Sequence, residues 1–507
     1  MTAPRSGVSA SSAAAAEVGA RILCRGGNAV DAAIATALAS CVADPGNCGI
    51  GGYGGAMIVA AHNAVPVCVD FNMWLPVDWP VKPFRRVYTN DHPEVTAIPN
   101  VVAGPSLALE RFGSMRWAEL VEPAIALASS GVETNGTTHR AFKEIDGTDF
   151  EKQCFVREPR SEGSFCFRQP ALAATLQELA RYGPQWFHDG PIGRAACAIM
   201  EGAGSPFSFD HWAVAPKAAR VVPAAALDLD GVLLYSAPLG TSGSPSLFAT
   251  VTKGEALARS GDLDTPSAVL AWARALAAIW SYRFGTPRGN DFSNISAVEW
   301  IEQALCFHPA GPIPTSIGHT CHLNTCDRNG TFVALTFTHG QYQFGGRWAV
   351  PKTGVIMNAG MHLLTTANPV SANGILYAVT NMSPAISRSN DGSSLAIGCP
   401  GARRIPTTIG LVIARHLFRG IPLQEAVSRG RFHAETGAAA SIETSRWDSA
   451  VVDALRLGFQ KVKDDQPPGA LTAIRRERDG AISFGLDDRC SKGYFTVGDG
   501  GAAVQSS

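Results

Sequence analysis

HTCHLNTCDRNGTFVALTFTHG, residues 319–340, predicts a β-hairpin of two apolar, hydroxyl-rich strands. Asp327 and Gly330 suit the first and last positions of a type I turn. A three-residue loop that ends in glycine then pairs Asp327 with Thr331. This pair sets the register of the two strands.

The register predicts which side chains share a face, because side chains alternate along a strand. Counting from the turn places Thr320 opposite Thr338 and His322 opposite Thr336, all on one face. Residues 309–318, PAGPIPTSIG, are rich in proline and glycine and predict an exposed loop, so the hydroxyl-rich face begins where this loop ends. The other face is apolar and should pack into the core: Leu323, Val333, Leu335 and Phe337.

Thr320 is the candidate nucleophile of this face. If the peptide bond between His319 and Thr320 is cut, the freed α-amine of Thr320, with a pKa of about 7.7 to 8.0, can take the proton of its own hydroxyl. Such a nucleophile needs no histidine base, cofactor or metal. The hydroxyl of Thr338 is suited to orient Thr320 by a hydrogen bond.

Residues 394–420, SLAIGCPGARRIPTTIGLVIARHLFRG, predict a short strand, a tight turn and a long helix. The first N–H groups of a helix have no partner within it and attract anions, so the amides of Gly401 and Ala402 suit an oxyanion hole. Taken alone, the turn is equally explained as a connection that binds nothing. Arg403 and Arg404 either bind a substrate anion or form structural ion pairs, and for Arg404 we favour the structural role.

The rest of the chain mixes helical and hairpin patterns. Residues 12–24 and 28–42 are alanine-rich and predict helices, and the second is nearly uncharged, which predicts burial on all sides. Residues 220–240 have strand propensity on both sides of an Asp-Gly turn. With 507 residues, 46% hydrophobic content and no internal repeat, the chain suits one large α+β body.

Composition limits the class of partner. The 42 basic and 43 acidic residues give a formal net charge of -1, which argues against nucleic acid or an anionic membrane surface as the partner. The N-terminal residues lack the apolar segment of a secretory signal and no stretch is apolar enough to span a bilayer, so we expect a cytoplasmic protein. The twelve cysteines lack the paired spacing of a zinc site. We therefore expect no metal or cofactor and a small molecule as the partner.

Other patterns compete with the threonine for a functional role. Cys321 is intrinsically more reactive, but alternation sends its side chain to the face opposite the hydroxyls. His322 and His339 suit the role of bases, although an N-terminal amine needs none. The glycines of residues 49–54 satisfy GxGxxG, yet they follow a predicted helix and precede a strand, the reverse of a dinucleotide-binding fold, so we assign no nucleotide.

Nine stretches, taken together and in order, resemble the γ-glutamyltransferase family, whose members are also called glutathione hydrolases. The resemblance implies a four-layer αββα sandwich and an enzyme, an N-terminal-nucleophile amidohydrolase or acyltransferase. It also implies cleavage into a large subunit, residues 1–319, and a small subunit, residues 320–507, which form one structural domain as a heterodimer from one chain. The stretches are GGNAVDAAIATAL (26–38), GIGGYGG (49–55), PAIALASSG (123–131), QPALAATLQELARYGP (169–184), APLGTSG (237–243), TCHLNTCDRNG (320–330), NMSPAI (381–386), GCPGARRI (398–405) and SRGRFH (428–433).

The resemblance also assigns catalytic residues. It implies that Thr320 is both the residue of self-cleavage and the nucleophile, and that Thr338 is the second threonine, which orients it. Gly401 and Ala402 occupy the positions of the oxyanion-hole pair, where the family usually has two glycines. An alanine still offers its N–H, so this change is mild.

The candidate substrate site departs from the family. Asn72, in DFNMWLP, stands where the family has an arginine for the substrate α-carboxylate, and Leu363 stands where it has an acidic residue for the α-amino group. Leu363 lies in NAGMHLLT, which begins with the candidate substrate residue Asn358, and Thr380 and Asn381 replace a pair of serines. Losing two charge-assisted bonds, each worth about 1.5 to 3 kcal/mol, predicts poor binding of free γ-glutamyl amino acids.

Three functions remain open from the sequence. The chain cleaves an amide, γ-glutamyl or another acyl group, through an acyl-enzyme on Thr320, and water or an amine acceptor completes the reaction. Alternatively, its specificity has moved to another acyl amide or to hydrolysis of a C–C bond in a biosynthetic pathway. The third function is that of a relative that does not catalyse and only binds a ligand or partner.

Overall fold

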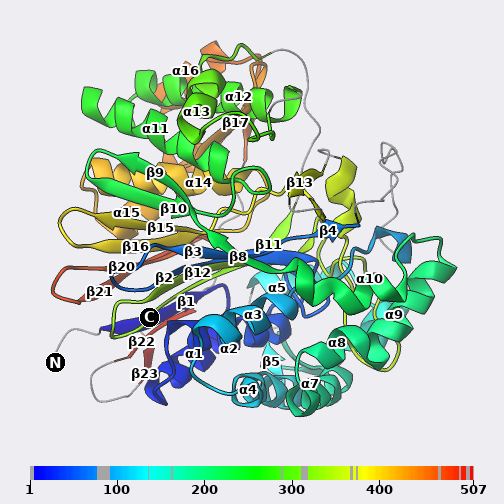
Figure 1. Cartoon of the computed structure of the whole chain (residues 1–507). Helices are drawn as coiled ribbons and strands as arrows, with labels where there is room; N and C mark the ends of the chain where they lie inside the picture. The colour runs from blue at the N-terminus through cyan, green and yellow to red at the C-terminus, as the bar shows by residue number, and fades with distance from the viewer. Residues whose placement is uncertain are drawn as a thin grey trace.

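Two antiparallel sheets lie face to face at the centre of the molecule, and helices cover the outer face of each (Figure 1). This arrangement confirms the predicted α+β class and the four-layer αββα sandwich. The structure, a computed structural model, describes residues 5–76, 92–134, 136–160, 164–286, 289–309, 318–365, 369–372, 375–465, 470–489, 493–497 and 503–505.

The first sheet carries the predicted hairpin at its centre. Each of its neighbouring strands is antiparallel to the next. The strand order is β23 (Ala503–Gln505), β22 (Gly493–Val497), β1 (Ser6–Ala10), β11 (His319–Cys326), β12 (Phe332–Gly340), β2 (Gly54–Ala60), β3 (Val67–Phe71) and β8 (Arg220–Pro223).

The second sheet, also antiparallel, packs on the first. It contains the strand predicted before Gly401 and the two strands predicted around the Asp-Gly turn. The strand order is β21 (Ile482–Leu486), β20 (Thr472–Arg476), β16 (Ser394–Gly398), β15 (Ala385–Ser389), β10 (Val232–Ser236) and β9 (Ala225–Leu229).

Two alanine-rich helices, α1 (Ala13–Cys24) and α2 (Ala29–Ala43), cover the outer face of the first sheet (Figure 1). Every residue of α2 is buried, which confirms the predicted burial on all sides. Small residues permit this packing: a Cβ built on Gly19 of α1 would lie 2.1 Å from the hydroxyl oxygen of Thr36 in α2. The two helices therefore approach closely only because one of them carries glycine at that point.

Further helices extend the layer on the first sheet, and a second group lies on the outer side of the other sheet (Figure 1). The first group comprises α3 (Ala103–Phe112), α4 (Trp117–Ser130), α5 (Gly136–Lys143), α6 (Asp149–Cys154), α7 (Pro170–Tyr182), α8 (Gln185–Asp189), α9 (Pro191–Gly202) and α10 (Phe209–Val214). The second comprises α11 (Ser244–Ser260), α12 (Pro266–Gly285), α13 (Ala297–Cys306), α14 (Arg404–Ile413), α15 (Leu423–Ser428) and α16 (Ser449–Gly458). Within this second group, α16 packs on α12.

Three small sheets lie at the edges of these layers. The first is β13 (Val370–Ala372), β14 (Ile375–Tyr377) and β4 (Trp74–Leu75), the second is β17 (Phe432–Thr436), β18 (Ala439–Ile442) and β19 (Lys461–Asp464), and the third is β5 (Val132–Glu133), β7 (Phe165–Arg168) and β6 (Val156–Pro159). Within the described ranges, no helix is both long and apolar enough to cross a membrane.

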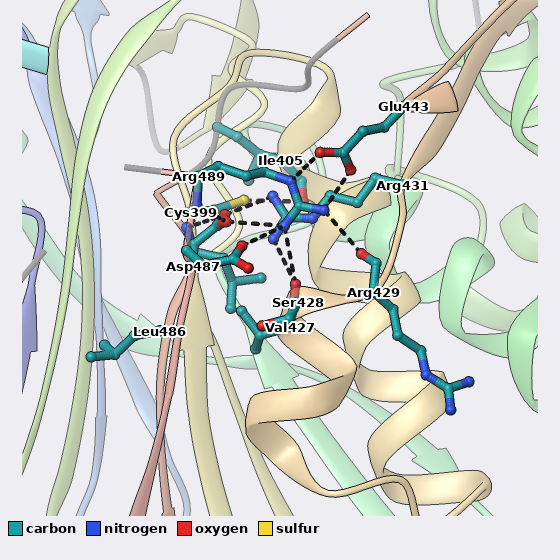
Figure 2. A network of polar contacts seen from close by, with 12 residues as sticks. Cys399, Ile405, Val427, Ser428, Arg429, Arg431, Glu443, Leu486, Asp487 and Arg489 are labelled. Atoms are coloured by element: carbon teal, nitrogen blue, oxygen red, sulfur yellow. Dashed lines mark hydrogen bonds and ion pairs between the residues drawn. The ribbon is translucent and has the colours of Figure 1, made fainter. Parts of the chain in front are cut away.

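A buried cluster of charged side chains anchors the second sheet to α15 and to β17 and β18 (Figure 2). Arg431 pairs with Asp487 at 2.7 Å, and Arg489 pairs with Asp487 at 3.0 Å and with Glu443. All four side chains are almost fully buried. Buried charges are tolerated where each has an opposite partner, so we interpret this cluster as a structural anchor.

Candidate functional site

The hairpin that carries Thr320 has the predicted turn and the predicted register over most of its length. The N–H of Gly330 donates to the carbonyl of Asp327 at 3.0 Å, and the N–H of Asp327 donates to the carbonyl of Thr331 at 3.1 Å. His322 lies opposite Thr336, as predicted. The predicted apolar face is buried against the helices of the first layer.

The hydroxyl-bearing face is also buried, because it packs against the second sheet. His322 forms hydrogen bonds with Thr336 at 2.8 Å and with Asn324 at 3.0 Å, and it is completely inaccessible to solvent. A Cβ built on Gly398 of the second sheet would lie 2.3 Å from the His322 ring. His322 is therefore a packed residue between the sheets and not a base in an open site.

At Thr320 a β-bulge interrupts the predicted register. The register shifts by one residue between His319 and Cys321, so His319 lies opposite Gly340, and Thr338 and His339 of β12 together face Thr320 in a β-bulge. Thr338, the expected partner of Thr320, pairs with Gly54 on its other side. A bulge breaks the ladder and re-aims a side chain, which alternation along a regular strand does not anticipate.

The bulge brings the hydroxyl of Thr338 to the peptide bond that precedes Thr320. Thr338 Oγ1 donates a short hydrogen bond to the carbonyl oxygen of His319 and accepts one from the N–H of Gly340 at 2.8 Å. The hydroxyl of Tyr53 also forms a hydrogen bond with Thr338, and burial raises the pKa of Tyr53, which keeps this phenol protonated. Two neighbours thus hold the Thr338 hydroxyl against the His319 carbonyl.

The turn before α14 lies close to the residues that precede Thr320: a Cβ built on Gly318 would lie 3.2 Å from the Cβ of Ala402. Gly401 has φ 131° and Ala402 has φ 52°, both in the left-handed region that favours glycine. Alanine there is strained by about 1 kcal/mol relative to glycine. Within the described ranges, neither amide donates a hydrogen bond to the protein.

A cavity that is open to solvent joins these parts. Of the predicted residues, the structure brings together Thr320, Thr338, Thr380, Asn381 and Ala402. Gly401 is attached to this group through its peptide bond with Ala402. The remaining lining residues are Tyr53, Gly318, Gly340, Gln341, Ala359, His362, Leu363, Met382 and Ile405.

Asn72 and Asn358, predicted as substrate residues, are not among the described residues that line the cavity. The Asn72 amide donates to the backbone carbonyls of Ala378 at 2.7 Å and Thr241 at 3.1 Å and accepts from the N–H of Met73. Asn358 is likewise buried and bonded to backbone, including the carbonyl of Gly51 at 2.8 Å and both polar backbone atoms of Ala97. Both side-chain amides are hydrogen-bonded to backbone groups of neighbouring segments.

Arg283, a fully buried residue of α12, holds the cavity wall and was missed in the sequence. Its guanidinium donates to the carbonyl of Thr380 at 2.9 Å, to the carbonyl of Ser242 and to Oδ1 of Asn381 at 3.4 Å. Its described hydrogen bonds all go to neutral oxygens, including Oδ1 of Asn290 and Oγ of Ser246. Burial and the nearby charge of Arg403 lower the pKa of Arg283 to about 9.

The two arginines after the turn form ion pairs. Arg403 is buried, pairs with Glu435 at 2.8 Å, and lies with its guanidinium carbon 4.5 Å from the centre of the Phe284 ring. Arg404 pairs with Asp465, in line with the structural role we favoured. Neither arginine is among the described residues that line the cavity.

The other rival residues lie outside the cavity. Cys321 is buried on the opposite face, as predicted, with its sulfur 3.2 Å from the hydroxyl oxygen of Ser11. Burial lowers the pKa of the inaccessible His339 to about 4, so it stays neutral. The glycines of residues 49–54 follow α2 and lead into β2, as expected, and residues 310–317 of the predicted loop lie outside the described residues. Across the described ranges, no group of three or more His, Cys, Asp or Glu side chains is arranged to hold a metal ion.

Comparison with known proteins gives a consistent result. The model of the gamma-glutamyltranspeptidase family matches residues 15–269 and 296–497. The glutathione hydrolase proenzyme of Escherichia coli (strain K12) is 26% identical over 539 residues, which cover 96% of this chain and 90% of that protein. The oxamate amidohydrolase proenzyme of Klebsiella pneumoniae is 26% identical over 448 residues, 81% of each chain. The crystal structure of cephalosporin acylase from Bacillus halodurans has the same fold, with a TM-score of 0.81 at 19% identity over 97% of this chain and 96% of that one.

Proposed function

This chain belongs to the gamma-glutamyltranspeptidase family of N-terminal-nucleophile amidohydrolases and acyltransferases, and we propose that it cuts itself between His319 and Thr320 and then cleaves a small-molecule amide. The two products, residues 1–319 and 320–507, stay together as a heterodimer, because β11 is hydrogen-bonded to β1 of the large part. Thr320, now N-terminal, carries the acyl group of the substrate.

The observation that carries this proposal is the hydrogen bond from the Thr338 hydroxyl to the carbonyl of His319. A donor on a carbonyl oxygen stabilises the negative charge that develops there when a nucleophile attacks the carbon. Thr320 directly follows His319 in the chain, and it lines the same cavity as Thr338. The uncut chain thus has its scissile bond polarised beside its own nucleophile.

Self-cleavage follows from this arrangement. The Thr320 oxygen attacks the His319 carbonyl carbon, a C–O ester bond forms, and the C–N bond breaks as the nitrogen takes the hydroxyl proton. Water then hydrolyses the ester, which leaves a carboxylate on His319 and both a free amine and a free hydroxyl on Thr320. Burial and the charge of Arg347 lower the pKa of His319 to about 4, so its imidazole is neutral at this stage.

Catalysis on a substrate reuses the same atoms. The α-amine of Thr320 takes the proton of its hydroxyl, the oxygen attacks the substrate carbonyl, and the amine of the substrate leaves with that proton. The amides of Gly401 and Ala402 are suited to hold the oxyanion, since neither has another acceptor in the described part of the chain. Water or an amine acceptor then releases the acyl group.

The composition of the cavity favours an altered specificity for another acyl amide, and C–C bond hydrolysis in a biosynthetic pathway stays an alternative. Leu363 is one of its lining residues, and Asn72 is occupied by backbone groups. The oxamate amidohydrolase is as similar to this chain, at 26% identity, as the glutathione hydrolase of Escherichia coli, so the family leaves room for an amide other than a γ-glutamyl compound.

Mass spectrometry of the purified protein tests the proposal. We expect two fragments, the smaller beginning at Thr320, and an acyl adduct on Thr320 after exposure to a panel of acyl amides. Thr320→Ala should stay intact, whereas Thr320→Ser, which keeps a hydroxyl, should still be cut. A wild-type chain that stays intact and forms no adduct would instead support the non-catalytic binder.

A further inference from the structure

The cavity beside Thr320 also indicates the chemical class of the acyl group. We propose that this cavity accepts an uncharged acyl group, tolerates an anionic group less well, and excludes a cationic group most strongly. The inference rests on the proposed function, because it takes Thr320 as the residue that is acylated.

The first argument is the chemistry of the cavity wall. Within the described ranges, the lining contains no Lys, Arg, Asp or Glu side chain. Leu363, Met382 and Ile405 supply apolar surface, and the polar side chains are neutral hydroxyls and amides. His362 packs edge-on against the Tyr342 ring, with ring centres 5.2 Å apart, and burial lowers its pKa. A charged group that enters loses water and gains no charged partner there.

The second argument concerns the charges directly behind the wall. Arg283 contacts the lining residue Asn381, and Arg403 follows the lining residue Ala402 in the chain. Both guanidinium groups lie against the ring of Phe284, at 5.0 and 4.5 Å from its centre. In this cluster Glu435 pairs with Arg403, whereas the hydrogen bonds of Arg283 within the described chain all go to neutral oxygens, so the net charge of the cluster is positive.

This positive charge distinguishes the two kinds of charged substrate. It repels an ammonium group and attracts a carboxylate through the wall, with a strength that falls with distance. Arg283 cannot bond directly to a carboxylate, however, because its donors are used by the carbonyls of Ser242 and Thr380 and by three side-chain oxygens. The attraction therefore offsets part of the desolvation cost of an anion and none of the cost of a cation.

The test is a ladder of four p-nitroanilides that share a five-carbon acyl chain and differ in charge: pentanoyl, glutaryl, 5-aminopentanoyl and γ-glutamyl. For the processed enzyme we expect the pentanoyl compound to exceed glutaryl in kcat/KM by at least about tenfold, and 5-aminopentanoyl to be the poorest of the single-charge compounds. Faster turnover of the glutaryl, 5-aminopentanoyl or γ-glutamyl compound than of pentanoyl would overturn the inference.

A pair of variants tests whether the acyl group lies next to Leu363 in the cavity wall. Leu363→Asp introduces a carboxylate, and Leu363→Asn is the uncharged control of the same shape. The ratio of 5-aminopentanoyl to pentanoyl turnover should be about tenfold higher in the Asp variant than in the Asn variant. Equal ratios would contradict the inference, and if the Asp variant does not fold, the wild-type ladder still decides.

The two proposals fail in different ways. A wild-type chain without a cut at Thr320 refutes the proposed function. A chain that is cut at Thr320 but prefers a charged acyl compound, or is acylated by none of the four, leaves self-cleavage intact and refutes only the uncharged acyl group.

Discussion

Replacing Thr338 by valine removes one hydroxyl and keeps the shape of the side chain. The hydroxyl donates to the His319 carbonyl and accepts the N–H of Gly340 at 2.8 Å. Removing one donor from a developing oxyanion typically slows a reaction by about 10² to 10³-fold, which corresponds to about 2.7 to 4 kcal/mol. We therefore expect self-cleavage of Thr338→Val to be slower by about that factor.

The assay is a time course of freshly synthesised chain on a denaturing gel, with Thr338→Ser as the matched control that restores the hydroxyl. The Ser variant should be cut at a rate close to that of the wild type. Cutting of the Val variant at the wild-type rate would refute the role we assign to this hydrogen bond.

Loss of stability is a competing explanation, and it can be measured separately. The valine leaves the buried N–H of Gly340 without its acceptor, which costs about 1 to 3 kcal/mol. Adding Thr338→Val to the uncut Thr320→Ala chain and comparing urea unfolding isolates this cost. A chain that is folded at the assay temperature but still uncut then assigns the slow step to the missing donor.

Three further predictions concern the surroundings of the site. Ala402→Gly should stabilise the chain by up to about 1 kcal/mol in urea unfolding and keep activity, because it relieves the left-handed backbone at φ 52°; a loss of stability would count against strain at this position. Arg283→Met should destabilise the fold, because it leaves the buried carbonyls of Ser242 and Thr380 unpaired at a cost of about 1 to 3 kcal/mol each; an unfolding midpoint equal to that of the wild type would contradict its structural role. Burial alone would raise the pKa of Glu435, but His433 and Arg403 lower it from 4.5 to about 2; the stability it contributes, about 2 kcal/mol, is thus present above pH 4.5 and lost as the pH falls towards 2. Glu435→Gln should flatten this acid limb in pH-dependent unfolding, and an unchanged limb would disprove the assignment.

The hairpin shows how far local sequence reaches. The turn at Asp327 and Gly330 and the pairing of His322 with Thr336 depend on residues within a few positions of one another, and the structure confirms both. The bulge at Thr320 was not predicted. It depends on how the end of β12 near Gly340 packs against its neighbours in space, and the alternation of side chains along a strand does not indicate it.

The candidate substrate residues show what local sequence does not predict. Asn72 matches a family position in sequence, but its amide is bonded to the carbonyls of Thr241 and Ala378, which are far away in the chain. The sequence did not indicate a role for Arg283 at the cavity, because its hydrogen-bond partners Thr380 and Asn381 are about a hundred residues away in the chain. Which polar groups are free for a substrate depends on which of them the rest of the protein has already bonded.

The sequence by itself determined the family, the layered α+β fold, the hairpin and the identity of the candidate threonine, because these follow from short-range patterns and collinear motifs. Only the tertiary structure decided that the Thr338 hydroxyl reaches the His319 carbonyl and that the described residues of the cavity wall carry no charge, with the arginines Arg283 and Arg403 behind them. The physical reason is that hydrogen bonding and electrostatic attraction act over a few ångströms in space, whereas the partners come from segments separated by tens to hundreds of residues.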